Sequence, residues 1–148
     1  MAFVIDKITK DNYPLFDDMV FWRENGVERE PENTSVSTKI VKELSNPDLF
    51  IYAAKVDKRY VGWISLIYMP KVGKWQGSGH IYIDELWIAP EFRRPGLGKE
   101  LMNKADELQQ ELSATGIRLY VNTENPGAEA LYKLCGFQNS GKAYFMEK

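Results

Sequence analysis

The stretch "IAPEFRRPGLGKELMNKADEL", residues 88–108, passes from an apolar, strand-like run into a run with helical spacing. Two glycines, Gly96 and Gly98, lie where the pattern changes, among three cationic side chains. A strand that ends in a glycine-containing turn and then begins a helix directs several unpaired N–H groups at one point, and the helix dipole adds partial positive charge there. The sequence therefore predicts a phosphate-binding turn at this position.

Two familiar phosphate motifs do not fit this turn. The nucleoside-triphosphate loop needs a glycine five residues before Gly98 and a hydroxyl after Lys99, but Arg93 and Glu100 occupy those positions. The dinucleotide fingerprint needs a third glycine three residues after Gly98, where this chain has Leu101. The phosphate that this turn binds is therefore expected to belong to another kind of ligand.

Composition limits the class of protein. The chain has 148 residues, of which 44% are hydrophobic and 27% are charged, so one globular domain over residues 1–148 is expected. No apolar run approaches the ~20 residues needed to span a bilayer, so we expect no membrane partner. The N-terminus has no basic region ahead of its short apolar stretch, which predicts no signal peptide and a cytoplasmic location.

Charge and cysteine content limit the partners. A net charge of -2 argues against nucleic acid as a partner and suits a cationic small molecule. The chain has one cysteine, Cys135, and one histidine, His80. An internal disulfide is therefore excluded, and a Cys/His metal site cannot be assembled, so no metal is expected.

Hydrophobic periodicity predicts strands and helices in a mixed order. Alternating or β-rich runs predict strands at 3–8, 49–56, 60–68, 80–88, 117–121 and 143–147. Helical spacing and capping signals predict helices at 11–25, 34–45, 97 to near 116, and 126–135. This order indicates an α/β (α+β) fold on a mostly antiparallel sheet, with one strand-helix-strand crossover in its second half.

Two motifs carry a resemblance to a known family. Arg93, Gly96 and Gly98 form Arg-x-x-Gly-x-Gly directly after a predicted strand. About 30 residues later, "NPGAEALYKLCGF" matches Asn-x-x-Ala-x-x-Leu-Tyr-x-x-x-Gly-Phe through Asn125, Ala128, Leu131, Tyr132, Gly136 and Phe137. In this order the two motifs resemble the GNAT superfamily of acetyl-coenzyme A-dependent N-acyltransferases. The resemblance is specific over about residues 60–148, whereas residues 1–48 match only in having a strand and two helices.

The resemblance implies a GNAT fold, with a mixed, mostly antiparallel sheet of six to seven strands and about four helices, and it implies acetyl-CoA as the donor. The pyrophosphate is expected at the turn that begins with Arg93, on the backbone amides of Arg94, Gly96, Leu97, Gly98 and Lys99. Pro95 has no N–H and removes one donor. Backbone groups of Leu86, Trp87 and Ile88 are expected to face the pantetheine arm and the oxyanion, and Asn125 to bond the pantetheine or cap the last helix.

Acetyl transfer to an amine needs a group that accepts the amine proton and a group that protonates the departing thiolate. Asp84 and Glu85 are adjacent carboxylates in an otherwise apolar strand, and alternation sends them to opposite faces unless a bulge intervenes. Asp84 is favoured by its match to relatives that acetylate small cationic amines. Many relatives carry a glutamate where this chain has Tyr120, so a water chain stays open as the base. The resemblance makes Tyr132 the general acid.

The sequence thus predicts an N-acetyltransferase that transfers acetyl directly to a primary amine of a small molecule, polyamine-like or aminoglycoside-like, or of a peptide. A non-catalytic CoA-binding sensor with the same fold is the main alternative, and a larger acyl donor is a second. A homodimer is compatible with the chain. Acidic residues around the first helix, among them Asp17, Asp18 and Glu28, are interpreted as solvated charges.

Overall fold

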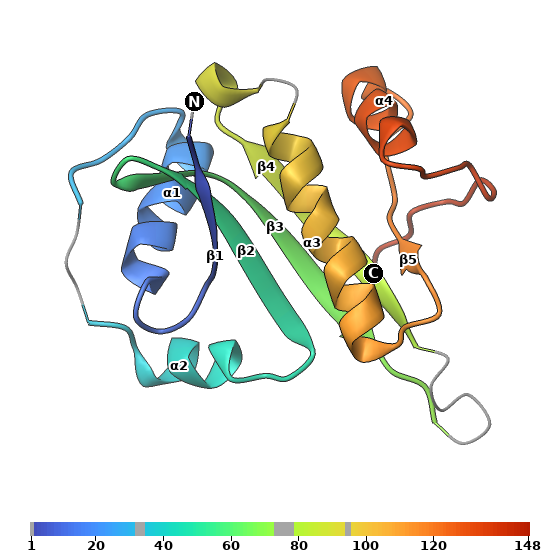
Figure 1. Cartoon of the computed structure of the whole chain (residues 1–148), viewed down its shortest axis with the longest axis horizontal. Coiled ribbons are helices and arrows are strands. Elements are labelled where there is room, and N and C mark those ends of the chain that lie inside the picture. Colours follow the sequence, from blue (N-terminus) through green and yellow to red (C-terminus); the bar gives the residue numbers. More distant parts are fainter. Residues whose placement is uncertain (1, 32–34, 73–78, 94–95) are drawn as a thin grey trace.

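A computed structural model describes residues 2–31, 35–72, 79–93 and 96–148 (Figure 1). The elements in chain order are β1 (Val4–Lys7), α1 (Tyr13–Asn25), α2 (Thr38–Leu44), β2 (Leu49–Val56), β3 (Arg59–Met69), β4 (His80–Ile88), the 3-10 turn η2 (Pro90–Phe92), α3 (Leu97–Leu112), β5 (Ile117–Arg118) and α4 (Pro126–Leu134). The predicted order of helices and strands is therefore confirmed up to α4.

The described strands form one five-stranded sheet in the order β1-β2-β3-β4-β5. The first four strands are antiparallel neighbours, as expected for strands joined by short connections, and β5 runs parallel to β4 after the α3 crossover. β4 and β5 pair only at Ile81 with Ile117 and at Tyr82 with Arg118. Beyond Tyr82, β4 therefore continues without β5 beside it.

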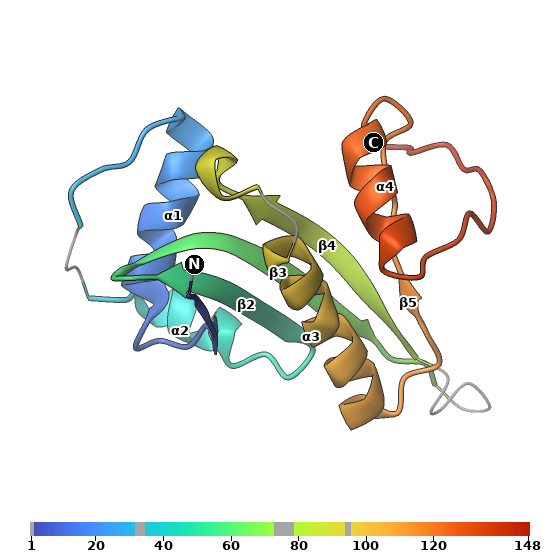
Figure 2. The ribbon, with the colours of Figure 1, turned by 45° about the horizontal axis from the view of Figure 1, so that its top comes forward.

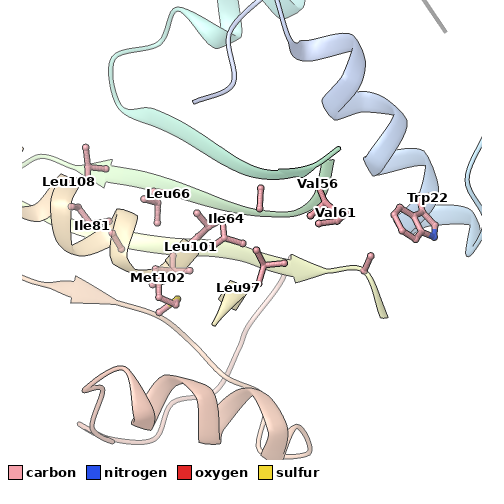
Figure 3. Packing of buried hydrophobic residues seen from close by; sticks show 14 residues of the cluster. Trp22, Val56, Val61, Ile64, Leu66, Ile81, Leu97, Leu101, Met102 and Leu108 are labelled. Carbon is pink, nitrogen blue, oxygen red and sulfur yellow. The ribbon is translucent and has the colours of Figure 1, made fainter. Parts of the chain in front are cut away.

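Helices cover both faces of the sheet. α1 buries Phe16 and Met19 against Trp63 on one face, and α3 packs on the other (Figure 2). The apolar stripe of α3 places Leu101 and Met102 over the sheet (Figure 3). Because β3 lies in the middle and is covered on both sides, its sequence is apolar almost throughout rather than alternating.

Local signals account for where the helices end. Ser37 caps α2, since its hydroxyl accepts a bond from the Ile40 amide at 3.3 Å, so this helix begins at residue 38 instead of 34. α1 ends as predicted at Asn25, where Gly26 takes a left-handed conformation with φ of 75°. α3 ends at Leu112, before residue 116, because Ser113 adopts a left-handed conformation.

The expected six to seven strands are too many for the described residues, which form five. β5 comprises two residues instead of 117–121, because its partner β4 diverges after Tyr82. Residues 143–147 form no strand, and Tyr144 and Phe145 are exposed. A strand-like sequence becomes a strand only when another strand satisfies its backbone groups, and no described strand pairs with these residues.

Candidate active site

The joint between β4 and α3 presents open backbone amides. Gly96, at the N-cap of α3, has a φ of 118°, a conformation that residues with a Cβ atom rarely adopt. The first helical hydrogen bond runs from the Glu100 amide to the Gly96 carbonyl at 2.9 Å, and none of the described side chains caps this end. The amides of Leu97, Gly98 and Lys99 precede that bond and point out of the helix end. Arg94, predicted to contribute its amide, and Pro95 lie outside the described residues.

Gly98 lets three elements meet at this joint. A Cβ atom at residue 98 would lie 3.2 Å from a terminal carbon of Leu131 in α4 and 3.3 Å from the terminal carbon of Ile88 in β4. Both contacts would be tight, so glycine at residue 98 lets the first turn of α3 approach its two neighbours closely. The two motifs seen in the sequence meet here, since Gly98 belongs to the first and Leu131 to the second.

A β-bulge displaces Asp84 from the regular ladder. Ser65 of β3 pairs with Glu85, but the next residue, Leu66, pairs with Ile83, so Asp84 is the extra residue of β4. A bulge interrupts the alternation of side chains between the two faces of a strand. Asp84 and Glu85 therefore need not lie on opposite faces of the sheet. Asp84 is exposed and forms no ion pair within the described part of the chain.

The surroundings of Asp84 and Glu85 differ in charge. Glu85 accepts a hydrogen bond from Arg23 Nη1 of α1, with 2.5 Å between nitrogen and oxygen. The pKa of the Tyr82 phenol is raised, mainly by burial and also by the negative charge of Asp84. Asp84 is therefore close enough to Tyr82 to interact with it electrostatically. The arrangement leaves Asp84 available to accept a proton, whereas Glu85 is held by a cation.

The open edge of β4 lies next to the bulge. The Ala89 amide donates to the Val61 carbonyl of β3 at 2.8 Å. Because backbone groups alternate between the two edges of a strand, those of Ile88 and Leu86 point away from β3, toward the side where β5 pairing has stopped. Trp87, opposite Trp63, directs its groups to β3 by the same rule. Of the three residues whose backbone groups were predicted to face the pantetheine arm, Leu86 and Ile88 therefore direct theirs to the open edge, and Trp87 does not.

Arg93 contacts the same edge. Its Nε donates to the Ile88 carbonyl at 2.8 Å, which ties the residue after η2 back onto the end of β4. The sequence motif did not indicate this bond, which depends on the turn made by η2 between the two residues. Arg93 therefore contributes to the shape of the joint through its side chain.

α4 brings Asn125 and Tyr132 to the same end of the molecule. The Asn125 side chain accepts a bond from the Ala128 amide at 3.1 Å, so it caps α4, one of its two expected roles. Tyr132 is half-buried, with its ring centroid 6.1 Å from that of Phe137. Burial raises the pKa of the Tyr132 phenol, which keeps the hydroxyl protonated at neutral pH.

Arginines hold several acidic residues that the sequence suggested were solvated. Arg29 bonds Asp17 and Asp18 at 3.0 Å each, and Arg59 bonds Glu28. These pairs join residues 11 to 31 positions apart in the chain, so no local sequence signal reports them. The same holds for Arg23, which is separated from Glu85 by 62 positions and was not identified from the sequence.

The described residues contain no cluster of three or more His, Cys, Asp or Glu side chains arranged to hold a metal ion. Within the same residues, every helix is too short or too polar to cross a membrane.

Comparison with known proteins gives the following similarities. Residues 12–137 match the Acetyltransferase (GNAT) family. The chain is 36% identical over 76 residues to an uncharacterized N-acetyltransferase of Methanocaldococcus jannaschii, and 30% identical over 77 residues to the thialysine N-epsilon-acetyltransferase of Bos taurus. These matches cover 51% and 52% of this chain but only 30% and 45% of the two relatives. A longer match, 26% identical over 141 residues, covers 95% of this chain and 76% of an uncharacterized N-acetyltransferase of Lactobacillus delbrueckii subsp. lactis.

Solved structures share the fold. An aminoglycoside acetyltransferase from an uncultured soil metagenomic sample superposes with a TM-score of 0.80 at 20% identity, covering 100% of this chain and 99% of that one. The aminoglycoside acetyltransferase AAC(6')-Iy, in complex with a bisubstrate analogue that contains CoA, gives a TM-score of 0.78 at 14% identity, again over 100% and 99% of the two chains. With the sequence match spanning both the joint at Gly96 and helix α4, the chain belongs to the GNAT acetyltransferase family.

Proposed function

We propose that the chain is an acetyl-CoA-dependent N-acetyltransferase that passes the acetyl group directly to a primary amine, without a covalent enzyme intermediate. The observation that carries this proposal is the bulge at Asp84, which puts an unpaired carboxylate beside the open edge of β4. At the other end of that edge, α3 begins with uncapped amides. A donor with a diphosphate at one end and a thioester at the other matches this spacing of an anion site and a reactive edge.

The donor is expected to lie along the open edge of β4. Its pyrophosphate accepts bonds from the amides of Gly96, Leu97, Gly98 and Lys99, where the helix dipole favours negative charge. The pantetheine arm takes the place that a neighbouring strand would occupy and pairs with the outward-facing backbone groups of Leu86 and with the amide of Ile88, whose carbonyl already accepts a bond from Arg93 Nε. One N–H of this edge also stabilises the oxyanion that forms on the thioester carbonyl.

Each proton in the proposed reaction has a carrier. An alkylamine with a pKa near 10.4 is about one part in a thousand free base at neutral pH, so Asp84, directly or through water, takes its proton. The nitrogen lone pair attacks the carbonyl carbon and the C–N bond forms, the nitrogen then releases its second proton to solvent, and the C–S bond breaks. Tyr132 gives its hydroxyl proton to the departing thiolate and regains one from solvent. The products are an N-acetylated amine and free CoA.

The acceptor is proposed to be a small molecule or a peptide. The bovine relative is named for acetylation of thialysine, and several of the solved neighbours are named for acetylation of aminoglycosides. Thialysine and the aminoglycosides are amines. A sensor that binds CoA without turning it over would use the same joint, but it would have no need for a free carboxylate at the bulge. The unpaired Asp84 therefore favours the enzyme.

The direct test combines binding with turnover. Calorimetric titration of the purified protein with CoA and acetyl-CoA should show saturable binding. Acetyl-CoA consumption should then be measured against polyamines, aminoglycosides, amino acids and short peptides, with the acetylated product identified by mass spectrometry. We expect at least one class of amine to be acetylated. Protein that binds CoA but acetylates none of these amines would support the sensor instead.

The glycine at the joint gives a prediction for donor binding. In Gly96→Ala the Kd for CoA should rise by roughly 10-fold, because an L-residue at positive φ costs about 1–2 kcal/mol and shifts the amides that face the phosphate. A Cβ atom at residue 96 would meet nothing within 4 Å, so steric clash does not complicate the result. Gly116→Ala is the matched control, since a Cβ there also meets nothing and φ is not positive. Equal CoA affinity of the two variants would contradict the placement of the diphosphate.

A further inference from the structure

Arginines pair with three of the five carboxylates of α1 and β4, and Glu24 and Asp84 are the two without an ion pair in the described residues. Four carboxylates in this region, those of Asp17, Asp18, Glu28 and Glu85, are each bonded by an arginine. Of the two carboxylates at the β4 bulge, Glu85 is bonded to Arg23, and Asp84 has no arginine partner in the described residues. The reactive edge therefore offers one free negative charge and, directly beside it, one arginine. This arrangement suits an acceptor that carries one ammonium group and one anion.

Arg23 is held in place but keeps bonding capacity. Its guanidinium lies over the Trp63 ring, with 5.4 Å between Cζ and the ring centroid, and only Nη1 bonds Glu85. The side chain is 40% exposed, and its Nε and Nη2 groups bond no other described residue. A guanidinium presents its donors in a planar fork that matches a carboxylate, so Arg23 can take a second carboxylate without releasing Glu85.

An aromatic cluster fixes the position of this arginine. Trp87 packs between Trp22 and Trp63, with ring centroids 5.8 Å and 5.3 Å away. Trp22 and Trp63 are buried, so neither ring can turn aside when a ligand arrives. Trp22 also precedes Arg23 in the last turn of α1, which ends at Gly26. The guanidinium is therefore presented from a rigid base on the same face as Glu85.

We infer that the amine acceptor also carries a carboxylate, and that Arg23 binds this carboxylate while Asp84 receives the amine. This inference rests on the proposed acetyltransferase activity and names the chemical class of its acceptor: a small zwitterionic amine with one ammonium group and one carboxylate, such as an omega-amino acid. Asp84 and Glu85 are consecutive, with Cα atoms about 3.8 Å apart, so both anchoring points lie within reach of one small molecule. A polyamine would instead bring a second cation against Arg23.

Binding of a second ammonium by Glu85 is the competing arrangement, and the geometry disfavours it. Glu85 already accepts a charge-assisted bond from Arg23. A substrate cation could bind it only by replacing that bond, which would leave the guanidinium without its partner above Trp63. A substrate carboxylate, by contrast, can bind Arg23 without breaking the bond between Arg23 and Glu85. Arg23 is thus a specificity-determining residue in this arrangement, separate from the groups that transfer protons.

The test uses acceptors that differ at one end only. Omega-amino acids of four to six carbons are compared with the amines in which the carboxylate is replaced by a methyl or an aminomethyl group, and kcat and KM are measured for each. Because a charge-assisted hydrogen bond contributes roughly 1.5–3 kcal/mol, the amino acid should be favoured in kcat/KM by about 10- to 100-fold over the diamine of the same length. The difference should appear mainly in KM.

Variants then separate the role of Arg23 from a loss of structure. Arg23→Gln should abolish the preference for the amino acid and raise kcat/KM for the diamine, because it removes a cation and frees Glu85. A misfolded protein cannot show that gain. Glu85→Gln should keep or increase the preference, since Arg23 is left with its full charge. Lys39→Gln, which removes an exposed ion pair on α2, should leave the ratio unchanged.

The outcomes distinguish this inference from the proposed function. If the diamine is acetylated at least as well as the amino acid, or if Arg23→Gln leaves their ratio unaltered, the acceptor class is wrong while the acetyltransferase activity stands. If no amine in the series or in the wider panel is acetylated, both the activity and its acceptor class are wrong.

Discussion

Asp84→Asn should lower kcat by about 10²- to 10⁴-fold, the contribution typical of a general base. Asparagine keeps the size of the side chain and its place in the bulge but cannot accept a proton from the amine. The loss should be smaller at high pH, because a larger fraction of an alkylamine is then already free base. Steady-state acetyl transfer measured between pH 7 and 10 checks both expectations.

Glu85→Gln is the internal control for this result. Both variants replace a carboxylate with an amide at neighbouring positions, but Glu85 is bonded to Arg23 and Asp84 is not. The kcat of Glu85→Gln should therefore fall by less than about 10-fold, and CoA affinity should be retained in both variants. A larger loss in Glu85→Gln than in Asp84→Asn would exchange the roles assigned to the two residues.

Tyr132→Phe should reduce kcat by about 10²-fold or more while the Kd for CoA changes little. The phenylalanine keeps the ring that packs on Phe137 and removes only the hydroxyl that would protonate the thiolate. A thiolate leaving group with a pKa near 8.5 needs a donor that is still protonated at neutral pH. Single-turnover acetyl transfer and calorimetry on the same preparation separate chemistry from binding.

The pH dependence follows from the direction of the Tyr132 shift. Burial raises the pKa of this phenol above its ordinary value near 10, so the protonated, active form persists throughout the neutral and mildly alkaline range. Deprotonation of Tyr132 should therefore cause no loss of kcat between pH 7 and 10, and any loss should begin only above that range. Normal turnover by Tyr132→Phe would refute the role of the hydroxyl, and with it the strongest distinction between an enzyme and a sensor.

Features that depend on neighbours in the chain could be predicted from the sequence. The bounds of β2 and β4 were predicted correctly, because alternating or continuous apolar runs between turn residues report strands directly. The joint at Gly96 was predicted from glycine spacing, and the structure shows why: a positive φ at the N-cap requires glycine. The cap of α4 by Asn125 is local in the same way, since donor and acceptor lie three residues apart.

Features that depend on distant partners could not be predicted. The sequence pattern at 143–147 is that of a strand, but the described structure has no strand beside it. Similarly, residues 117–121 carry strand-forming side chains over their whole length, but only Ile117 and Arg118 pair with β4. In both cases the missing information is the position of another part of the sheet, which side-chain preferences do not contain.

The sequence alone specifies the order of the elements through α4, the glycine-containing joint at residues 96–99 and the family to which its two motifs point. Those features arise from backbone conformation and hydrogen bonds within a few residues. The different surroundings of Asp84 and Glu85 arise only when the chain folds. The bulge is a mismatch between β4 and β3, and the partner of Glu85 is Arg23, on a helix 62 residues earlier in the chain. Register and long-range ion pairs exist only once the chain has folded, because they are relations between segments that the sequence keeps apart.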